Sequence, residues 1–547
     1  MMFCLDDGAE LLYGPASTEE PATAILSTDR ISSEQATRTF GQSSGVGLPP
    51  ATGAGHVASK RNSIIAGIVG VVLVTALGIG SYLFYGGKRG QIDSIAVLPF
   101  ENRSGNADTD YLSDGLAESL IYRLSQLPNL KVSPVSSVVR YKGKEVDAKR
   151  IAAELGVGAV MSGRMTQRGE NLTISVELID AANNKILWGE QYDRKMSDLL
   201  ATQREIAATI AQKLQVKLSG NERGVTKKYT DNNEAYQLYL KGRFHFLKRT
   251  KPDLFKSIEI FEEAVKLDPN FALAYVGIAE SYTVIPSFPY DSPENCIPQA
   301  KTAAAKALEL DPELPEAHAV SAMIAATYDW DWAKAEAGFK RALELDPNVS
   351  ITHYRYAWTY LSPMGRHDEA IAEMKIAMEK EPLYLMQGAN YAAVLMYARR
   401  FDEAVEQAKR TYDLDPDFIG SINWLGHTNA AKGNYADALA MVEKSADSDM
   451  PLRAAAGYAY AKTGQRSKAL ANIEQWKAIE KKRYVQNYWV AIAYAAMGDN
   501  DGAFAELEKA YKHRDWFLQR LKVDPFMDPL RGDPRYDEMV KRLNLPN

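Results

Sequence analysis

The 547-residue chain is poor in the residues and motifs that usually carry enzyme chemistry. It has two cysteines, Cys4 and Cys296, which fall on opposite sides of its one long apolar run, so no intramolecular disulfide framework is expected. Its seven histidines are scattered without the spacing of metal ligands. A phosphate-binding loop of the form G-x-x-x-x-G-K-S/T and an H-E-x-x-H pair are both absent. We therefore predict that the protein is not an enzyme and has no catalytic residue, cofactor or metal site.

The charge balance excludes one class of partner. Acidic residues outnumber basic ones by 70 to 64, which gives a net charge of −6. A surface that binds nucleic acid usually carries a basic excess, so we predict no nucleic-acid partner. The chain is also too long for a single hydrophobic core, so several domains are expected.

One long apolar run, Ile64–Tyr85, reads IIAGIVGVVLVTALGIGSYLFY. It has the length of about 20 residues that a helix needs to cross a bilayer. Basic residues flank both ends: Lys60, Arg61, Lys88 and Arg89. A buried core helix, the alternative, would usually show a polar face over this length. We predict one transmembrane helix over residues 63–86, where small residues four apart leave self-association open.

Residues 1–62 are rich in Ser, Thr, Gly, Ala and Pro, which predicts a disordered arm. The phrase FCLDDGAELL (Phe3–Leu12) resembles the second knuckle of a small bacterial zinc ribbon. A structural zinc site needs four ligands, whereas only Cys4 is present and Asp7 stands where a second cysteine would be. We predict no metal, and interpret the phrase as a remnant or as a sign that the true start lies upstream.

Residues 91–218 are predicted to form a small α/β domain. An apolar strand at Ser94–Phe100 is followed by helical spacing of apolar residues over Tyr111–Leu127. A short strand at Lys131–Pro134 and a helix at Val146–Leu155 come next. Three strands joined by turn residues and a last helix are expected at Ala159–Thr166, Leu172–Asp180, Lys185–Tyr192 and Met196–Leu214. Apolar and polar residues alternate in the middle strand of the three, so one of its faces should be buried.

Several phrases of this domain carry a family resemblance. SIAVLPFENRSGNADTDYLSDGLAESLIYRLSQ, AAELGVGAVMSGRM and ILWGEQYDR occur in this order and resemble the TolB amino-terminal-like domain. The resemblance implies a mixed sheet with helices packed on it, and no catalytic activity. Similar bacterial proteins keep the N-terminal arm in the cytoplasm and the later domains outside. It therefore implies a single-pass inner-membrane protein with a periplasmic body, and the lipid bilayer as one partner.

The loop 101–110 and the start of the helix after it hold three acids, Asp108, Asp110 and Asp114. Such carboxylates could bind a hard cation, but their spacing does not fit a 12-residue calcium loop. We interpret them as solvated acids that favour the N-terminus of the helix.

From residue 232 to residue 516 the chain repeats itself about eight times. Alanines recur at intervals of 35, 35, 34, 34, 31 and 34 residues: Ala300, Ala335, Ala370, Ala404, Ala438, Ala469 and Ala503. A period near 34 residues is typical of tetratricopeptide repeats, each a pair of helices. A loop insertion at Ile285–Pro298 is predicted to lengthen the second unit, and residues 517–547 resemble the cap that such an array needs over its last open face.

The inner wall of such an array is formed by the first helix of each unit. With one extra loop residue allowed in two units, the fifth and ninth helix positions are mostly apolar and aromatic. The Lys, Arg and Asn cluster that holds a peptide carboxylate in some tetratricopeptide proteins is missing at these positions. We predict a groove for an apolar protein or peptide segment, lined by Met323, Tyr354, Trp358, Asn423, His427, Tyr458, Tyr488 and Ile492. The alternative is that some of these rings pack between the units.

Two functions follow from this organisation. The first is a membrane-anchored scaffold for protein–protein interaction. The alternative is the sensory or regulatory half of a bacterial signalling protein whose kinase, cyclase or DNA-binding output is missing or lies on another chain. Residues 1–62 are too short for those outputs and lack the kinase motifs H-R-D and D-F-G.

Overall fold

The structure is a computed structural model that describes residues 92–105, 109–125, 127, 130–214, 229–381, 384–444 and 452–546. All of these residues belong to one structural unit. The predicted disordered arm, the zinc-ribbon-like phrase and the predicted transmembrane helix lie outside the described residues.

The fold class and the location require a correction. Among the described residues, no helix combines the length and the apolar character that crossing a membrane requires. The predicted fold with one transmembrane helix at residues 63–86 therefore has no support in the described residues, and neither has the inner-membrane location that depended on it. The physical reason is that an apolar run of sufficient length is necessary for a spanning helix but does not by itself make one.

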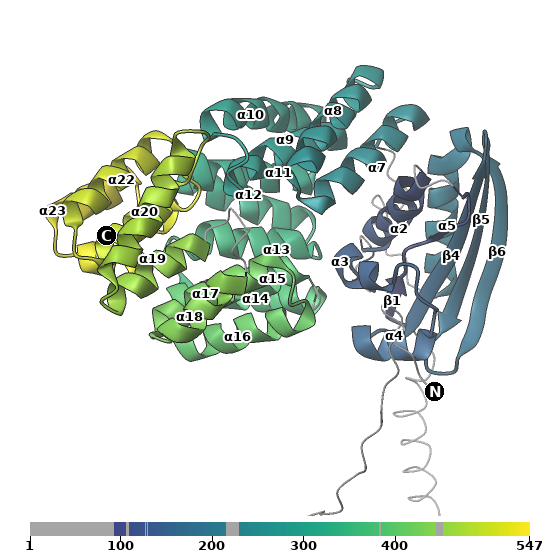
Figure 1. The fold of residues 1–547 in the computed structure, drawn as a ribbon. Helices are drawn as coiled ribbons and strands as arrows, with labels where there is room; N and C mark the ends of the chain where they lie inside the picture. Colours follow the sequence, from purple (N-terminus) through teal and green to yellow (C-terminus); the bar gives the residue numbers. More distant parts are fainter. Residues whose placement is uncertain are drawn as a thin grey trace, which may run out of the picture. The chain divides into compact units, whose positions relative to one another are not determined.

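Residues 92–214 form the predicted α/β domain, with a mixed sheet in the order β3-β1-β4-β5-β6. The strands are β1 (Ser94–Val97), β2 (Glu101–Asn102), β3 (Lys131–Ser133), β4 (Ala159–Arg168), β5 (Asn171–Asp180) and β6 (Lys185–Lys195). The helices are α2 (Asp110–Ser125), α3 (Val135–Val138), α4 (Ala148–Leu155) and α5 (Leu199–Lys213). β1 runs parallel to β3 and β4, whereas β4, β5 and β6 are antiparallel neighbours. Figure 1 shows α2 and α5 on one side of the long strands.

The alternation in β5 decides which face of the sheet these helices cover. Its apolar residues are all buried, at 0 or 1% exposure: Leu172, Ile174, Val176 and Leu178. Since successive side chains of a strand point to opposite faces, this register places one apolar face against α2 and α5. The predicted hairpins and the buried face are confirmed.

The acids at the start of α2 have protein partners. Asp114 accepts a hydrogen bond from Lys142 Nζ (2.7 Å), and Asp110 accepts one from Asn102 Nδ2 (2.7 Å). Asp108 lies outside the described residues. Within the described part of the chain, no group of three or more His, Cys, Asp or Glu side chains could hold a metal ion.

Eight helix pairs follow within the described residues, and each pair packs on the next (Figure 1). The first four pairs are α7 (Asn233–Lys248) with α8 (Lys251–Leu267), α9 (Ala272–Val284) with α10 (Pro293–Leu310), α11 (Pro315–Ile324) with α12 (Trp332–Leu345), and α13 (Ser350–Tyr356) with α14 (His367–Lys380). The last four are α15 (Leu385–Tyr397) with α16 (Phe401–Leu414), α17 (Ile419–Lys432) with α18 (Tyr435–Lys444), α19 (Leu452–Lys462) with α20 (Arg466–Glu480), and α21 (Asn487–Ala496) with α22 (Asn500–Lys512). All seven alanines that mark the period are 0% exposed, because a small side chain there lets two helices approach closely.

Two units carry their extra residue inside the first helix and not in a loop. α11 continues into a π-helical turn at Ala325–Asp329, and α13 continues into one at Ala357–Leu361. In the second turn, Ser362 N donates to the carbonyl oxygen of Ala357, five residues earlier (3.0 Å). A π turn absorbs one additional residue without ending the helix, so the two intervals of 35 residues have a helical cause.

The predicted insertion at Ile285–Pro298 is only partly a loop. A 3-10 turn at Ile285–Ser287 leads to α10, which begins at Pro293 and contains Pro298. Cys296 is therefore a buried helix residue, and burial raises the pKa of its thiol to about 12.

The C-terminal cap, defined here as residues 515–546, contains a 3-10 turn at Leu518–Arg520, another at Pro525–Leu530 and α23 (Pro534–Arg542). It reaches far back along the sequence: Trp332 Nε1 donates to the Leu543 carbonyl (2.9 Å). Just ahead of it, Arg514 Nη1 donates to the Tyr328 carbonyl (2.9 Å). The end of the array is thus held against its third unit.

Candidate ligand-binding cavity

The cap covers half of the predicted groove. The ring of Phe526 lies 4.5 Å from that of Tyr458 and 5.9 Å from that of His427, centroid to centroid. The Tyr488 hydroxyl donates to Asp524 Oδ2 at 2.8 Å. The structure therefore brings three of the eight predicted groove residues against the chain's own C-terminal end.

His427 and Ile492 are both 0% exposed. His427 Nδ1 donates to the carbonyl of Asn423 (2.9 Å), and burial lowers the pKa of the imidazole to about 4. The ring also packs 5.2 Å from that of Trp489. These contacts match the alternative in which some of the predicted anchors pack within the array.

The other four predicted residues, Met323, Tyr354, Trp358 and Asn423, line a cavity of about 1120 Å³. Its wall is formed by the first helices of successive pairs, α7, α9, α11, α13, α15 and α17, with α2 and α3 of the α/β domain on another side. Trp358 lies at the edge of the covered half, because the Arg520 guanidinium of the cap stands 3.8 Å above its ring. That these residues bind a partner stays a prediction.

Two buried hydrogen-bonded groups join the α/β domain to α7 beside this cavity. The Tyr236 hydroxyl donates to Gln203 Oε1 (2.8 Å) and lies 2.8 Å from Ser119 Oγ. Arg243 Nε donates to Glu118 Oε1 (3.0 Å). A ligand in the cavity would therefore touch both the repeats and the surface that holds the α/β domain against them.

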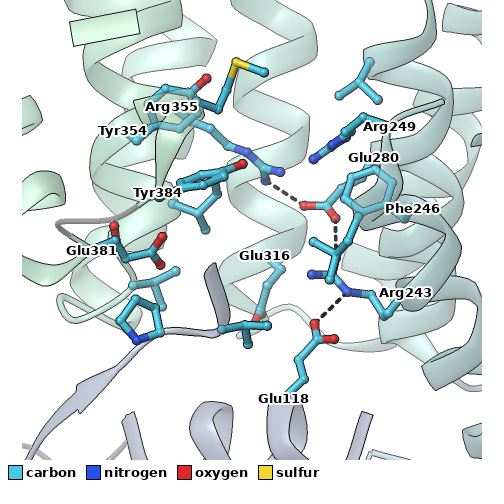
Figure 2. A pocket seen from close by; sticks show the side chains of 18 of the residues that line it. Glu118, Arg243, Phe246, Arg249, Glu280, Glu316, Tyr354, Arg355, Glu381 and Tyr384 are labelled. Carbon is cyan, nitrogen blue, oxygen red and sulfur yellow. Dashed lines mark hydrogen bonds and ion pairs between the residues drawn. The ribbon is translucent and has the colours of Figure 1, made fainter. Parts of the chain in front are cut away.

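A chain of charges crosses one wall of the cavity (Figure 2). Arg243 Nη1 donates to Glu280 Oε2 (3.0 Å), and Arg355 Nη1 donates to Glu280 Oε1 (2.7 Å). Glu280 is 5% exposed. Burial pushes the pKa of this carboxyl up, but Arg355 and Arg243 outweigh burial, so its pKa is lowered and it is ionised at neutral pH.

Arg249 stands beside this chain of charges without a fixed anion. It follows the last residue of α7 with φ of 58°, a left-handed conformation that is uncommon for a residue with a side chain. Its guanidinium stacks 3.8 Å from the Phe246 ring, and its Nη1 is buried without a hydrogen-bond partner. Burial lowers the pKa of this guanidinium. Figure 2 shows the Arg249 side chain near the end of Arg355 and the Glu280 carboxylate.

This cluster lies outside the helix positions from which the groove was predicted. Those were the fifth and ninth positions of each first helix, whereas Arg355 follows a fifth position and Arg249 lies in the turn after α7. Glu280 on α9 offered a signal, since a lone acid in an otherwise apolar helix needs a buried partner.

Two family models match parts of the chain. Residues 91–209 match the second domain of HilA/YgeH-like transcriptional regulators, and residues 339–372 match a tetratricopeptide repeat. The fold and these matches define the class: an α/β domain similar to that regulator domain, followed by tetratricopeptide repeats. The resemblance of the α/β domain to TolB is not shown.

Particular relatives can be named. A putative adenylate cyclase 3 of Rhizobium meliloti is 32% identical over 228 residues, which are 41% of this chain and 39% of that protein. The transcriptional regulator HilA of Salmonella typhimurium is 22% identical over 451 residues, 80% of this chain and 78% of that protein. The chain thus spans well under half of the cyclase-named relative. A solved structure of pilF from Pseudomonas aeruginosa is 19% identical and covers 38% of this chain and 91% of its own, with a TM-score of 0.30.

Proposed function

We propose that the chain is a protein-interaction module that takes a peptide segment of a partner into the cavity between the first repeats and the α/β domain. The main support for this proposal is that the cap fills only one part of the predicted groove and leaves the other part open. The cap fills the part around His427, Tyr458 and Tyr488, whereas the part around Tyr354 and Asn423 stays open as a cavity of about 1120 Å³.

The chemistry of the open part supports a peptide ligand. Its wall is largely aliphatic and aromatic, which favours burial of apolar side chains. Tyr354 and Trp358 are aromatic anchors of the kind that dominate binding energy in interfaces. Polar groups such as Asn423 at the wall could pair with a peptide backbone.

A peptide library displayed on phage and selected against the purified chain tests this proposal. Ile351 lines the cavity and is half-buried, so Ile351→Trp should fill part of the space. Leu470 on α20 is 42% exposed and outside the cavity, so Leu470→Trp is the matched control. Selected peptides should bind roughly tenfold more weakly to the first variant and equally to the control. Peptides that bind both variants like the unchanged chain would place their site elsewhere.

A second candidate is the sensory or regulatory half of a signalling protein. The relatives favour it, because one is named as a putative adenylate cyclase and another as a transcriptional regulator. In this function, occupation of the cavity changes the contact between Arg243 and Glu118. Hydrogen exchange measured with and without a selected peptide tests this: α2 should become better protected, while α20 should not change. An unchanged α2 would argue against this function and leave the first intact.

A further inference from the structure

The charges around Glu280 do not balance. Three guanidinium groups, those of Arg243, Arg249 and Arg355, gather on this wall, and Figure 2 shows all three near the Glu280 carboxylate. Two carboxylates face them, because Glu118 holds Arg243 from the α/β side. The cluster therefore carries one positive charge more than it has fixed anions.

Other charged side chains also line the cavity, among them Lys380, Glu381, Asp415 and Asp417. Lys248 is paired with Asp253 (3.6 Å). Within the described residues, Arg243 and Arg355 form ion pairs with the carboxylates of the cluster, whereas Arg249 forms none.

Arg249, which lines the cavity, also has a donor without a partner. The residue as a whole is partly exposed, but its Nη1 atom is buried and lacks a hydrogen-bond partner. A buried charged donor without an acceptor is costly, and native proteins satisfy such groups in nearly all cases. The left-handed backbone at this residue adds to the cost of holding the guanidinium there.

We propose that this position binds the carboxylate of an apolar ligand, with the Arg249 guanidinium as the principal donor and Arg355 beside it. This inference rests on the proposed function and specifies the ligand's chemistry. One negative charge balances the cluster, which favours a monoanion over a phosphate dianion. A guanidinium also matches the two oxygens of a carboxylate in geometry. Arg249 and Arg355 do not occupy the helix positions at which some tetratricopeptide proteins hold a peptide carboxylate with Lys, Arg and Asn.

The rest of the cavity indicates the chemistry of the part of the ligand that is not the carboxylate. The wall of the cavity also carries apolar side chains, among them Phe246, Leu273, Val276, Ile351 and Met386. An acyl chain or apolar side chains would be buried against this wall, while the carboxylate reaches the arginines. Two sources have this chemistry: a small organic acid and the C-terminus of an apolar peptide.

Calorimetric titration of the full chain with two pairs of probes separates these sources. The first pair is decanoate and decanol, and the second is an acetylated tetrapeptide of leucine and phenylalanine with a free or an amidated C-terminus. At least one acid should bind roughly tenfold or more tightly than its neutral counterpart, and Arg249→Gln should abolish that difference. Arg341→Gln, which removes an exposed arginine paired with Glu344, should leave it unchanged.

The melting temperature of Arg249→Gln without ligand separates a binding role from a structural one. Because the variant loses a buried donor without a partner, its melting temperature should be equal to or above that of the unchanged chain. A clear drop would assign Arg249 to the fold and overturn the inference, as would acids that bind no better than their neutral forms. If acid and neutral forms bind equally well, the proposed function stands and only the carboxylate site falls.

Discussion

The cap that covers half of the groove should loosen as the pH rises. Asp515 is 0% exposed and accepts hydrogen bonds from the Tyr484 hydroxyl (2.8 Å) and from Tyr488 N (3.1 Å). Burial outweighs these bonds and raises the pKa of Asp515 from 3.8 to about 7. Asp524 behaves alike, since burial raises its pKa to about 6.

The direction of the effect follows from proton binding. Between about pH 4 and pH 7 the folded chain keeps a proton on Asp515 that the unfolded chain has lost, so the free energy of unfolding falls as the pH rises through this window. A shift of about 3 pKa units corresponds to roughly 4 kcal/mol for complete titration, an upper limit. His427 acts in the opposite direction, because its pKa is lowered to about 4 and stability rises with pH up to about 6.5.

Asp515→Asn isolates the contribution of Asp515. The amide stays uncharged at every pH, so the variant should gain stability relative to the unchanged chain as the pH rises from 5 to 8, by roughly 2–4 kcal/mol. Urea unfolding followed by circular dichroism at several pH values measures this difference. Asp501→Asn, at a side chain that is 92% exposed, is the control for removing a carboxylate at the surface. A pH-independent difference for Asp515→Asn would refute the reasoning.

Two further changes test the packing around the cavity. Glu280→Gln leaves Arg243 and Arg355 buried without their shared carboxylate and should destabilise the chain by roughly 3–5 kcal/mol in urea unfolding; a loss below about 1 kcal/mol would show that the arginines find other partners. Gly242→Ala places a Cβ 2.5 Å from the Phe261 ring, so the melting temperature should fall, with a cost of roughly 1–3 kcal/mol. An unchanged melting temperature would mean that the ring moves aside freely.

Local periodicity predicted the parts of this fold that depend on neighbours in the sequence. The alternation of β5 gave its buried face, and alanines such as Ala335 and Ala370 gave the close contacts between helices. In both cases a short-range pattern of side-chain size and polarity is sufficient, because the partner surface comes from the same repeat or the next strand.

The π turns and the cap could not be predicted in this way. A 35-residue interval shows that a unit has one additional residue, but not whether that residue lies in a loop or inside a helix. The structure has it in a π turn at Ala357–Leu361. The cap reaches Trp332 from Leu543, more than 200 residues away. No period in the sequence encodes such a contact, so the covering of Tyr458 by Phe526 was invisible from residue types alone.

The two halves of the concave wall differ in what lies against them: the cap packs on one half, and the other half lines the open cavity. Around Tyr458 the rings and the Tyr488 hydroxyl find partners in the chain's own cap, although His427 Nε2 and Arg520 Nη1 in this half are also buried without a hydrogen-bond partner. Around Glu280 the carboxylate is shared by two arginines, while Arg249 Nη1 is left without an acceptor. Buried polar groups are seldom left unpaired in native proteins. The open half is the one where a ligand has room to add a partner, and this supports the binding site proposed at the first repeats, next to the α/β domain.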